Sequence, residues 1–316
     1  MKRIVVGPFN RVEGDLEVTL DVEGGVVRSA RVCSPMYRGF EQILIGKKAL
    51  DALTIVPRVC GICSVAQSAA AARALASAMQ LRAPENGRLA SDLVRATESA
   101  ADHLTHFYLF FMPDFAREAY ARRSWFAPVQ ARFQAMRGSA AAEALDARAR
   151  LLDVMGLLAG KWPHTLALQP GGTSRAVHRH EKIQLLLALR AFRAFLEGKL
   201  FGDALERVAA IDDAAALAAW RDERPASASD FRAFLAVAED LALERFGRAH
   251  DVFLSFGAYG PEGAPWLAPG VFDGALRPLE PATIREDVSH AWLADEGSRH
   301  PSRGVTRPAP DKADAY

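Results

Sequence analysis

Pro57-Arg58-Val59-Cys60-Gly61-Ile62-Cys63-Ser64 is the stretch of this chain that says most about its fold and chemistry. It places two cysteines, Cys60 and Cys63 (the cysteine pair), one helical turn apart, a spacing at which two thiolates can chelate a soft transition metal. A closed thiolate site usually has four ligands. Because the only other cysteine is Cys33, the chain cannot complete such a site with its own sulfur.

The cysteine pair has three common interpretations: a redox dithiol, half of a zinc site, or half of another metal site. A redox motif of the thioredoxin kind needs a βαβ context, whereas the expected strands lie well before the pair. A zinc site needs a second pair of ligands, for which His103/His106 and His178/His180 have a suitable spacing. The first of these pairs is better explained by helix packing beside aromatic residues, and two buried apolar cysteines are a further alternative. The local sequence therefore favours a metal site but does not identify the metal.

Composition limits the classes of function. The chain has 316 residues, half of them hydrophobic, and a formal net charge of +1, which gives no basic field for nucleic acid. Three cysteines make no disulfide framework, and neither a secretory signal nor a membrane-length apolar stretch is evident. We therefore expect a soluble, cytoplasmic protein without membrane insertion.

Hydrophobic periodicity predicts an α+β fold that is predominantly α. Alternating Leu16, Val18, Leu20 and Val22 indicate a strand, and a Gly-Gly turn leads to a second strand over 26–32. Helices are predicted over 64–79, within 84–112, and over 140–158, 179–200, 214–221 and 229–246, the last capped by Ser229 or Asp230. The long helix within 84–112 is expected to end at Pro113 and to carry its apolar face on Leu89, Leu93, Ala96, Ala100, Leu104 and Phe107.

These elements suggest a small N-terminal β-sheet followed by a large helical body. We expect one domain, 1–316, incomplete at its C-terminus: 1–50 mostly β, 51–256 mostly helical, and 257–316 Pro/Gly-rich with short strands, turns and an irregular tail.

Five sequence blocks in a fixed order carry a family resemblance. The chain resembles the large subunit of nickel–iron hydrogenases over essentially its whole length. The blocks are Arg11-Val12-Glu13-Gly14-Asp15, Tyr37-Arg38-Gly39-Phe40-Glu41, Arg58 to Cys63, Gly160-Lys161-Trp162-Pro163-His164 with Gly171-Gly172, and Ser289-His290-Ala291-Trp292 continuing through His300-Pro301, Gly304 and Thr306-Arg307-Pro308.

The resemblance implies a role for individual residues. Cys60 would be a terminal nickel ligand, and Cys63 would bridge nickel and an iron that carries cyanide and carbon monoxide. Glu13 would accept a proton after heterolytic splitting of hydrogen, provided that burial raises its pKa. Glu41 would bind magnesium, and His164 would lie near an iron–sulfur small subunit.

Without the resemblance, each of these residues has an ordinary alternative. Glu13 is then a surface carboxylate, Glu41 a charge at a helix N-terminus, and His164 a loop histidine. Cys33 is expected to be only a small strand residue.

At two positions the sequence departs from the pattern of most family members, and these differences point to one subfamily. Most members have a histidine where Gln67 stands, and many have one where Asp15 stands. The segments 60–67 and 103–111 look like those of the hydrogen-sensing, regulatory group, in which bulky residues narrow a gas channel. Ile62 and Phe110 match those channel positions, although both are equally compatible with a role in the core.

The same family comparison suggests partners and near-site residues. Arg58, Gln67 and His164 are expected near the site or at the subunit interface. The partners implied are the iron–sulfur small subunit, hydrogenase maturation proteins and a sensor kinase.

The second half of the metal site is not in this sequence. The family supplies another cysteine pair from a C-terminal block, but no cysteine follows Cys63 here. We therefore expect a truncated large subunit of a hydrogen-sensing [NiFe] hydrogenase, inactive as given because two of four thiolates are missing. The alternative is a non-catalytic scaffold for assembly of the nickel–iron centre.

Overall fold

The computed structural model describes residues 1–9, 14–247, 250–261, 263–304 and 306–316, without the side chain of Glu41. The chain forms two compact units. The sheet unit comprises Met1–Lys47, Val252–Ala258 and Leu267–Tyr316, and the helical unit comprises Lys48–Asp251 and Tyr259–Trp266. The predicted division of one large domain at residues 50 and 256 stays a prediction.

The predicted N-terminal sheet is present in the sheet unit. Strands β1 (Lys2–Phe9), β2 (Leu16–Glu23) and β3 (Val26–Cys33) form an antiparallel sheet in the order β1-β2-β3. Gly24 and Gly25 make the turn between β2 and β3 with φ of 58° and 80°, a left-handed conformation that glycine adopts at little cost. Cys33 is the last residue of β3, as expected for a small strand residue.

The rest of the sheet unit consists of short elements. These are α1 (Phe40–Ile43), the strands β6 (Phe253–Ala258), β7 (Leu267–Phe272) and β8 (Leu276–Arg277), and an irregular segment to Tyr316. The Tyr37 hydroxyl and the Gln42 amide both donate to the carbonyl of Thr306 at 3.2 Å, which links α1 to the irregular segment. Short strands and turns were predicted for this Gly/Pro-rich region.

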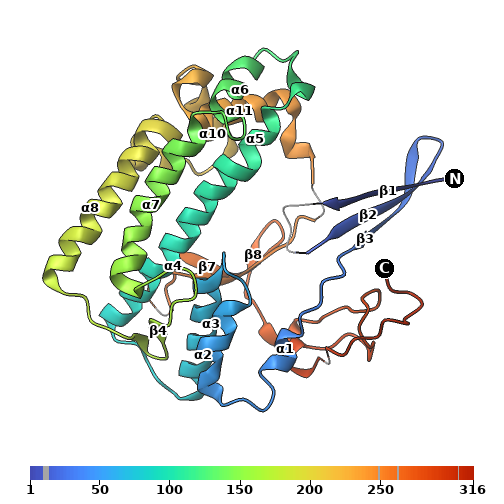
Figure 1. Cartoon of the computed structure of the whole chain (residues 1–316), viewed down its shortest axis with the longest axis vertical. Helices are drawn as coiled ribbons and strands as arrows, with labels where there is room; N and C mark the ends of the chain where they lie inside the picture. The colour runs from blue at the N-terminus through green and yellow to red at the C-terminus, as the bar shows by residue number, and fades with distance from the viewer. Residues whose placement is uncertain (10–13, 248–249, 262, 305) are drawn as a thin grey trace. The chain divides into compact units, whose positions relative to one another are not determined.

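The helical unit contains the helical body that the periodicity predicts. Its helices are α2 (Ala52–Ile55), α3 (Ser64–Ala78), α4 (Glu85–Thr105), α5 (Met112–Phe115), α6 (Phe126–Phe133), α7 (Ala140–Ala159), α8 (Arg179–Phe195), α9 (Leu205–Ala209), α10 (Ala214–Asp222) and α11 (Asp230–Leu241). A two-stranded ribbon joins β4 (Leu168–Gln169) and β5 (Gly172–Thr173). Helices α4, α7 and α8 lie side by side (Figure 1). None of the helices in the described ranges combines the length and the apolar content that a membrane span requires.

Two details of the long helix differ from the prediction. Leu89 and Leu93 are 43% and 37% exposed. The buried face keeps the predicted Leu104 and otherwise consists of Ala90, Val94, Thr97, Glu98 and Ala101. The helix also does not end at Pro113. A π-helical segment, His106–Phe111, leads into α5, whose first turn contains Pro113, where its missing N–H is tolerated.

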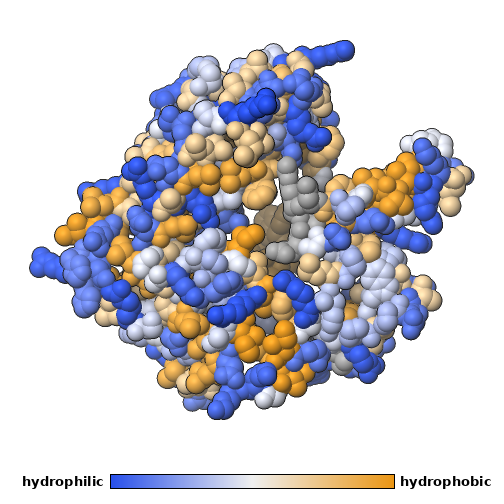
Figure 2. Space-filling view, viewed as in Figure 1, coloured by the Kyte–Doolittle hydropathy of each residue, from blue (hydrophilic) through white to orange (hydrophobic). Residues whose placement is uncertain are grey.

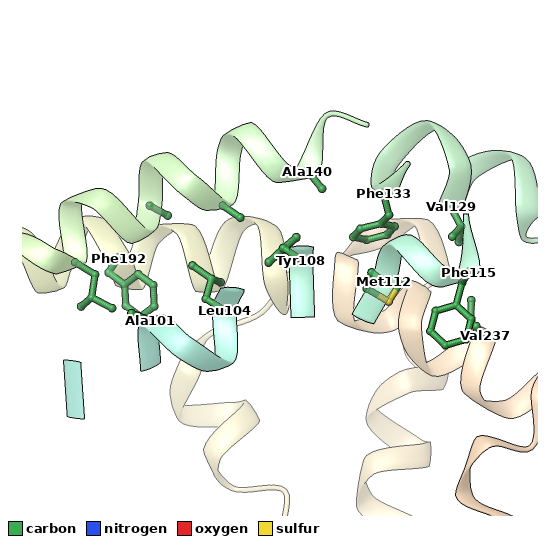
Figure 3. Close-up of a cluster of buried hydrophobic side chains, with 13 residues drawn as sticks. Ala101, Leu104, Tyr108, Met112, Phe115, Val129, Phe133, Ala140, Phe192 and Val237 are labelled. Atoms are coloured by element: carbon green, nitrogen blue, oxygen red, sulfur yellow. The ribbon is translucent and has the colours of Figure 1, made fainter. Parts of the chain in front are cut away.

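Two large hydrophobic clusters hold the helical unit together. One joins residues from α4 to α11, among them Leu104, Tyr108, Met112, Phe133 and Leu151 (Figure 3). The other packs Val65 and Ala69 of α3 against Val94 of α4 and Val154 of α7. The second cluster therefore holds α3, which directly follows the cysteine pair, against the long helices.

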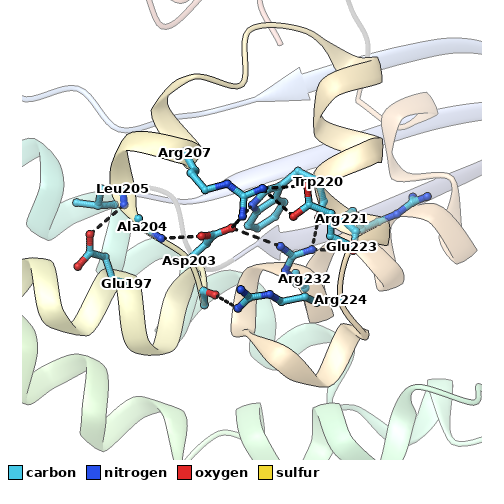
Figure 4. A network of polar contacts seen from close by, with 11 residues as sticks. Glu197, Asp203, Ala204, Leu205, Arg207, Trp220, Arg221, Glu223, Arg224 and Arg232 are labelled. Atoms are coloured by element: carbon cyan, nitrogen blue, oxygen red, sulfur yellow. Dashed lines mark hydrogen bonds and ion pairs between the residues drawn. The ribbon is translucent and has the colours of Figure 1, made fainter.

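Two polar networks, one around Asp230 and one around Arg232, connect elements of the helical unit. The Tyr108 hydroxyl donates to Asp230 at 2.7 Å, and Arg132 donates to the same carboxylate at 2.8 Å. The second network surrounds Arg232, whose side chain is fully buried and whose guanidinium lies 3.7 Å from the centre of the Trp220 ring (Figure 4). Burial lowers the pKa of this guanidinium.

Candidate metal centre

The cysteine pair lies in a turn between a 3-10 segment, Val56–Arg58, and α3. Both cysteines are free and half-buried. The backbone N–H of Cys63 donates to the sulfur of Cys60 at 3.4 Å, which holds that sulfur over the turn beside Cys63. The turn presents two thiols, an arrangement that suits chelation of a soft metal.

The environment of Cys63 favours its protonated form. Burial raises the pKa of the Cys63 thiol, and its hydrogen bond with Cys60 raises this pKa further. The side-chain amide of Gln67 donates to the Cys63 sulfur at 3.6 Å and lowers the pKa. Gln67, one turn along α3, thus lies beside Cys63.

His164 lies against the same turn. Its Nδ1 is 2.9 Å from the carbonyl oxygen of Pro57, and because a carbonyl only accepts, Nδ1 carries the proton. A Cβ added at Gly61 would lie 3.8 Å from His164 Cε1 and 4.0 Å from Nε2. The Cε1–Nε2 edge of the ring therefore faces Gly61, the first of the two residues between the cysteines.

The backbone of His164 is constrained as well. Its φ is 62°, an uncommon value for a residue other than glycine. Its N–H donates to the Ser64 hydroxyl at 3.2 Å. His164 is thus attached to both flanks of the pair, at Pro57 and at Ser64.

A buried carboxylate that sequence reasoning missed also belongs to this region. Glu98 of α4 is 6% exposed and accepts hydrogen bonds from the backbone of Val65 and Ala66 and from the indole of Trp162. A signal was present, because Glu98 follows Ala90 and Val94 on one face of the helix. A glutamate among small apolar residues at this phase indicates a buried acid with partners.

Three further predicted residues are exposed. Ile62 is 54% exposed and Phe110 is 43% exposed, so a gas-channel role for them stays a prediction. Arg58 is exposed and donates to the carbonyl of Thr54 in α2.

The structure does not test the predicted roles of the two carboxylates, Glu13 and Glu41. Glu13 lies outside the described residues. Glu41 lies in α1, but its side chain is not described. Their roles in proton transfer and magnesium binding stay predictions.

The histidine pairs do not complete a zinc site. In the part of the chain that the structure describes, no group of three or more His, Cys, Asp or Glu side chains is placed to hold a metal ion. His106 stacks on Phe111 and His178 on His180, both with ring centroids 5.8 Å apart.

The fold and this dithiol turn define a class: a predominantly helical α+β protein that offers two thiolates to a soft metal. A family model described as nickel-dependent hydrogenase matches residues 38–123 and 129–316. The chain therefore belongs to the nickel-dependent hydrogenase family, which confirms the family resemblance. The likeness to a solved hydrogenase structure, given below, confirms the fold class.

Individual relatives agree with this assignment. The chain is 26% identical to the periplasmic [NiFeSe] hydrogenase large subunit of Desulfomicrobium baculatum over 99% of its own length. It is 35% identical to the hydrogenase-2 large chain of Escherichia coli over 107 residues, which are 34% of this chain and 19% of the relative. The structure of the Ni-Fe-Se hydrogenase from D. vulgaris Hildenborough aligns with all of this chain at 25% identity and a TM-score of 0.77.

The matched relatives are longer than this chain. It spans 59% of the D. baculatum subunit and 62% of the D. vulgaris chain. The chain is a hydrogenase large-subunit sequence, and the activity and partners of the whole protein are matters for proposal.

The two thiols fit a nickel–iron group in part. Cys60 and Cys63 are free, close together and of the donor type that nickel and iron accept. They supply two thiolates, and Cys33 belongs to the other unit.

Proposed function

We propose that this chain acts in the large subunit of a hydrogen-sensing nickel–iron hydrogenase. The observation that carries the proposal is the dithiol turn of Cys60 and Cys63, held against α3 and His164. When bound, a nickel–iron group with cyanide and carbon monoxide on its iron would supply heterolytic cleavage of hydrogen.

The chain's own residues would prepare the site. Cys60 and Cys63 would bind as thiolates after losing their protons to solvent on metal loading. The Gln67 amide would donate to the Cys63 sulfur, and the His164 ring would cover Gly61. Glu13 is proposed to accept the proton from a thiolate, and Glu41 to bind magnesium.

Several partners and a location belong to the same proposal. An iron–sulfur small subunit is supported by the words "large subunit" and "large chain" in the names of the relatives. Maturation proteins, a sensor kinase and a cytoplasmic location follow from the sequence interpretation alone. The D. baculatum relative is named as periplasmic, so the location has to be measured.

Metal content tests the proposal. The large-subunit polypeptide, isolated from its native cells and separated from the iron–sulfur subunit, should contain nickel and iron in equal amounts, measured by mass spectrometry of the elements. Cys60→Ser or Cys63→Ser should lower both metals at least about tenfold, because a two-thiolate chelate loses one ligand. The matched control, Cys33→Ser, should keep both metals.

The possible results separate the functions. Iron without nickel in the native protein would favour the assembly scaffold over the sensor. Absence of both metals would overturn the metal site.

Oxygen tolerance tests the sensing function. If Ile62 and Phe110 narrow the path of gas to the metals, the double change Ile62→Val and Phe110→Leu should make hydrogen uptake sensitive to oxygen, because a wider bottleneck admits the larger molecule. Gln67→His should act in the same direction. Hydrogen uptake that survives oxygen equally in wild type and variants would contradict the channel role.

A further inference from the structure

Helix α3 begins immediately after Cys63, and its first N–H groups need acceptors from outside the helix. For two other helices of this chain, the side chain of the residue before the helix accepts one of these N–H groups. The Asp213 carboxylate accepts from Ala216 N at 2.6 Å for α10, and the Ser229 hydroxyl accepts from Arg232 N at 3.2 Å for α11. These are ordinary local caps.

Cys63 occupies the capping position of α3 but makes no side-chain capping bond. A cysteine sulfur is a weak acceptor, and this sulfur instead accepts the Gln67 amide. The start of α3 therefore needs a cap from another element if Cys63 is to keep its sulfur for other bonds.

Glu98 of α4 is that cap. Its Oε1 accepts from Val65 N at 2.9 Å, and its Oε2 accepts from Ala66 N at 3.0 Å. A negative charge at this end of the helix is also favoured by the helix dipole. Glu98 is 6% exposed, so these bonds are shielded from competing water.

The same carboxylate reaches the loop that carries His164. Oε1 also accepts from the Trp162 indole at 2.9 Å and from the Ser64 hydroxyl at 3.4 Å. The Ser64 oxygen in turn accepts the backbone N–H of His164 at 3.2 Å. One buried side chain thus connects the end of the dithiol turn to the loop that places the His164 ring over Gly61.

We propose that Glu98 is the positioning residue of the cysteine pair. It caps α3 in place of Cys63, which leaves the Cys63 sulfur available to a metal, and it holds the His164 loop against the turn. The capping stands on the geometry alone, whereas its importance for metal binding rests on the proposed function.

Amide exchange of the metal-free full chain tests the capping. In Glu98→Ala, exchange at Val65 and Ala66 should accelerate about tenfold to hundredfold, as expected when a hydrogen bond to a charged group is lost. In Glu98→Gln only one of the two amides should accelerate, because the side chain keeps a single acceptor oxygen. Glu181→Gln is the matched control, since Glu181 is a buried carboxylate at the start of α8 that accepts from His178 N at 2.7 Å.

Metal affinity tests the positioning. Cd²⁺ is a soft probe, and its binding to the pair is followed by thiolate-to-metal absorption in the ultraviolet. The Kd for Cd²⁺ should rise at least about tenfold in Glu98→Ala and stay unchanged in Glu181→Gln. If Glu98→Ala does not fold, Glu98→Gln decides, with accelerated exchange at one amide and a smaller rise in Kd.

The outcomes separate this inference from the proposed function. Unchanged exchange at both amides together with an unchanged Kd would overturn the role of Glu98, whatever metal the native protein holds. Loss of amide protection and of Cd²⁺ affinity would support it even if the native protein contained neither nickel nor iron.

Discussion

The Cys63 thiol is acted on from two sides. Burial and the contact with Cys60 raise its pKa, whereas the amide of Gln67 lowers it by donating to the sulfur. The balance decides how much thiolate exists before any metal arrives. Replacing Gln67 removes the only one of these contributions that favours the thiolate through a donated hydrogen bond.

Alkylation against pH measures this balance. In the metal-free wild type, the midpoint for iodoacetamide reaction at Cys63 should lie above the ordinary thiol value of about 8.5, because the charged form is disfavoured. Gln67→Leu should move the midpoint higher still and slow the reaction at pH 7.5 about threefold. Peptide mass spectrometry reports Cys63 separately, and Cys33 is the internal control. A faster reaction in Gln67→Leu would show that the amide does not stabilise the thiolate.

At the scale of elements, local sequence signals were sufficient to predict where most helices lie. They were insufficient to predict which residues contact one another between helices. The ranges of α7 and α10 follow from periodicity, and the Ser229 cap of α11 follows from one residue type. The cap of α3 could not be predicted from local sequence, because Glu98 lies 32 to 34 residues from the N–H and hydroxyl groups it accepts from. The predicted buried face of α4 was wrong at Leu89 and Leu93 and right at Leu104, because packing against α3 and α7 decides which face is covered.

The ion pair between Arg132 of α6 and Asp230 of α11 predicts that two Asp→Ala variants differ in how much unfolding free energy they lose. Asp230 has a side chain 9% exposed and pairs with Arg132 at 2.8 Å, while it also accepts from Tyr108. Asp230→Ala leaves Arg132 with its Glu143 pair but removes the acceptor of the buried Tyr108 hydroxyl and one charged partner of the guanidinium. It should lower the free energy of unfolding by about 2 kcal/mol.

The matched control is Asp146→Ala on α7. Its pair with Arg150 is 66% and 61% exposed, so the loss should be at most about 1 kcal/mol. Urea denaturation of both variants measures the difference. Equal losses would show that the Tyr108–Asp230–Arg132 network adds no more than a surface pair.

At the scale of the whole molecule, the two units differ in how much they bury. Among the described residues of the sheet unit only Asp21 and Gly270 are buried, and hydrophobic residues show at the surface of its N-terminal sheet (Figure 2). Val5, Val26 and Val32 are each more than half exposed. The hydrophobic clusters of the described chain all lie in the helical unit.

This difference predicts the order of proteolysis. Because local opening is least costly where few apolar contacts are lost, trypsin should cut the sheet unit first and leave a fragment that contains α3 to α11. Leu151→Ala, at a position 2% exposed in the main cluster, should cost about 2 to 5 kcal/mol and shorten the lifetime of that fragment. Val32→Ala, at a position 52% exposed on β3, should change the lifetime little. Mass spectrometry of timed digests identifies the cuts, and early cleavage within α4 or α7 would show that the helical core does not govern the stability of this chain.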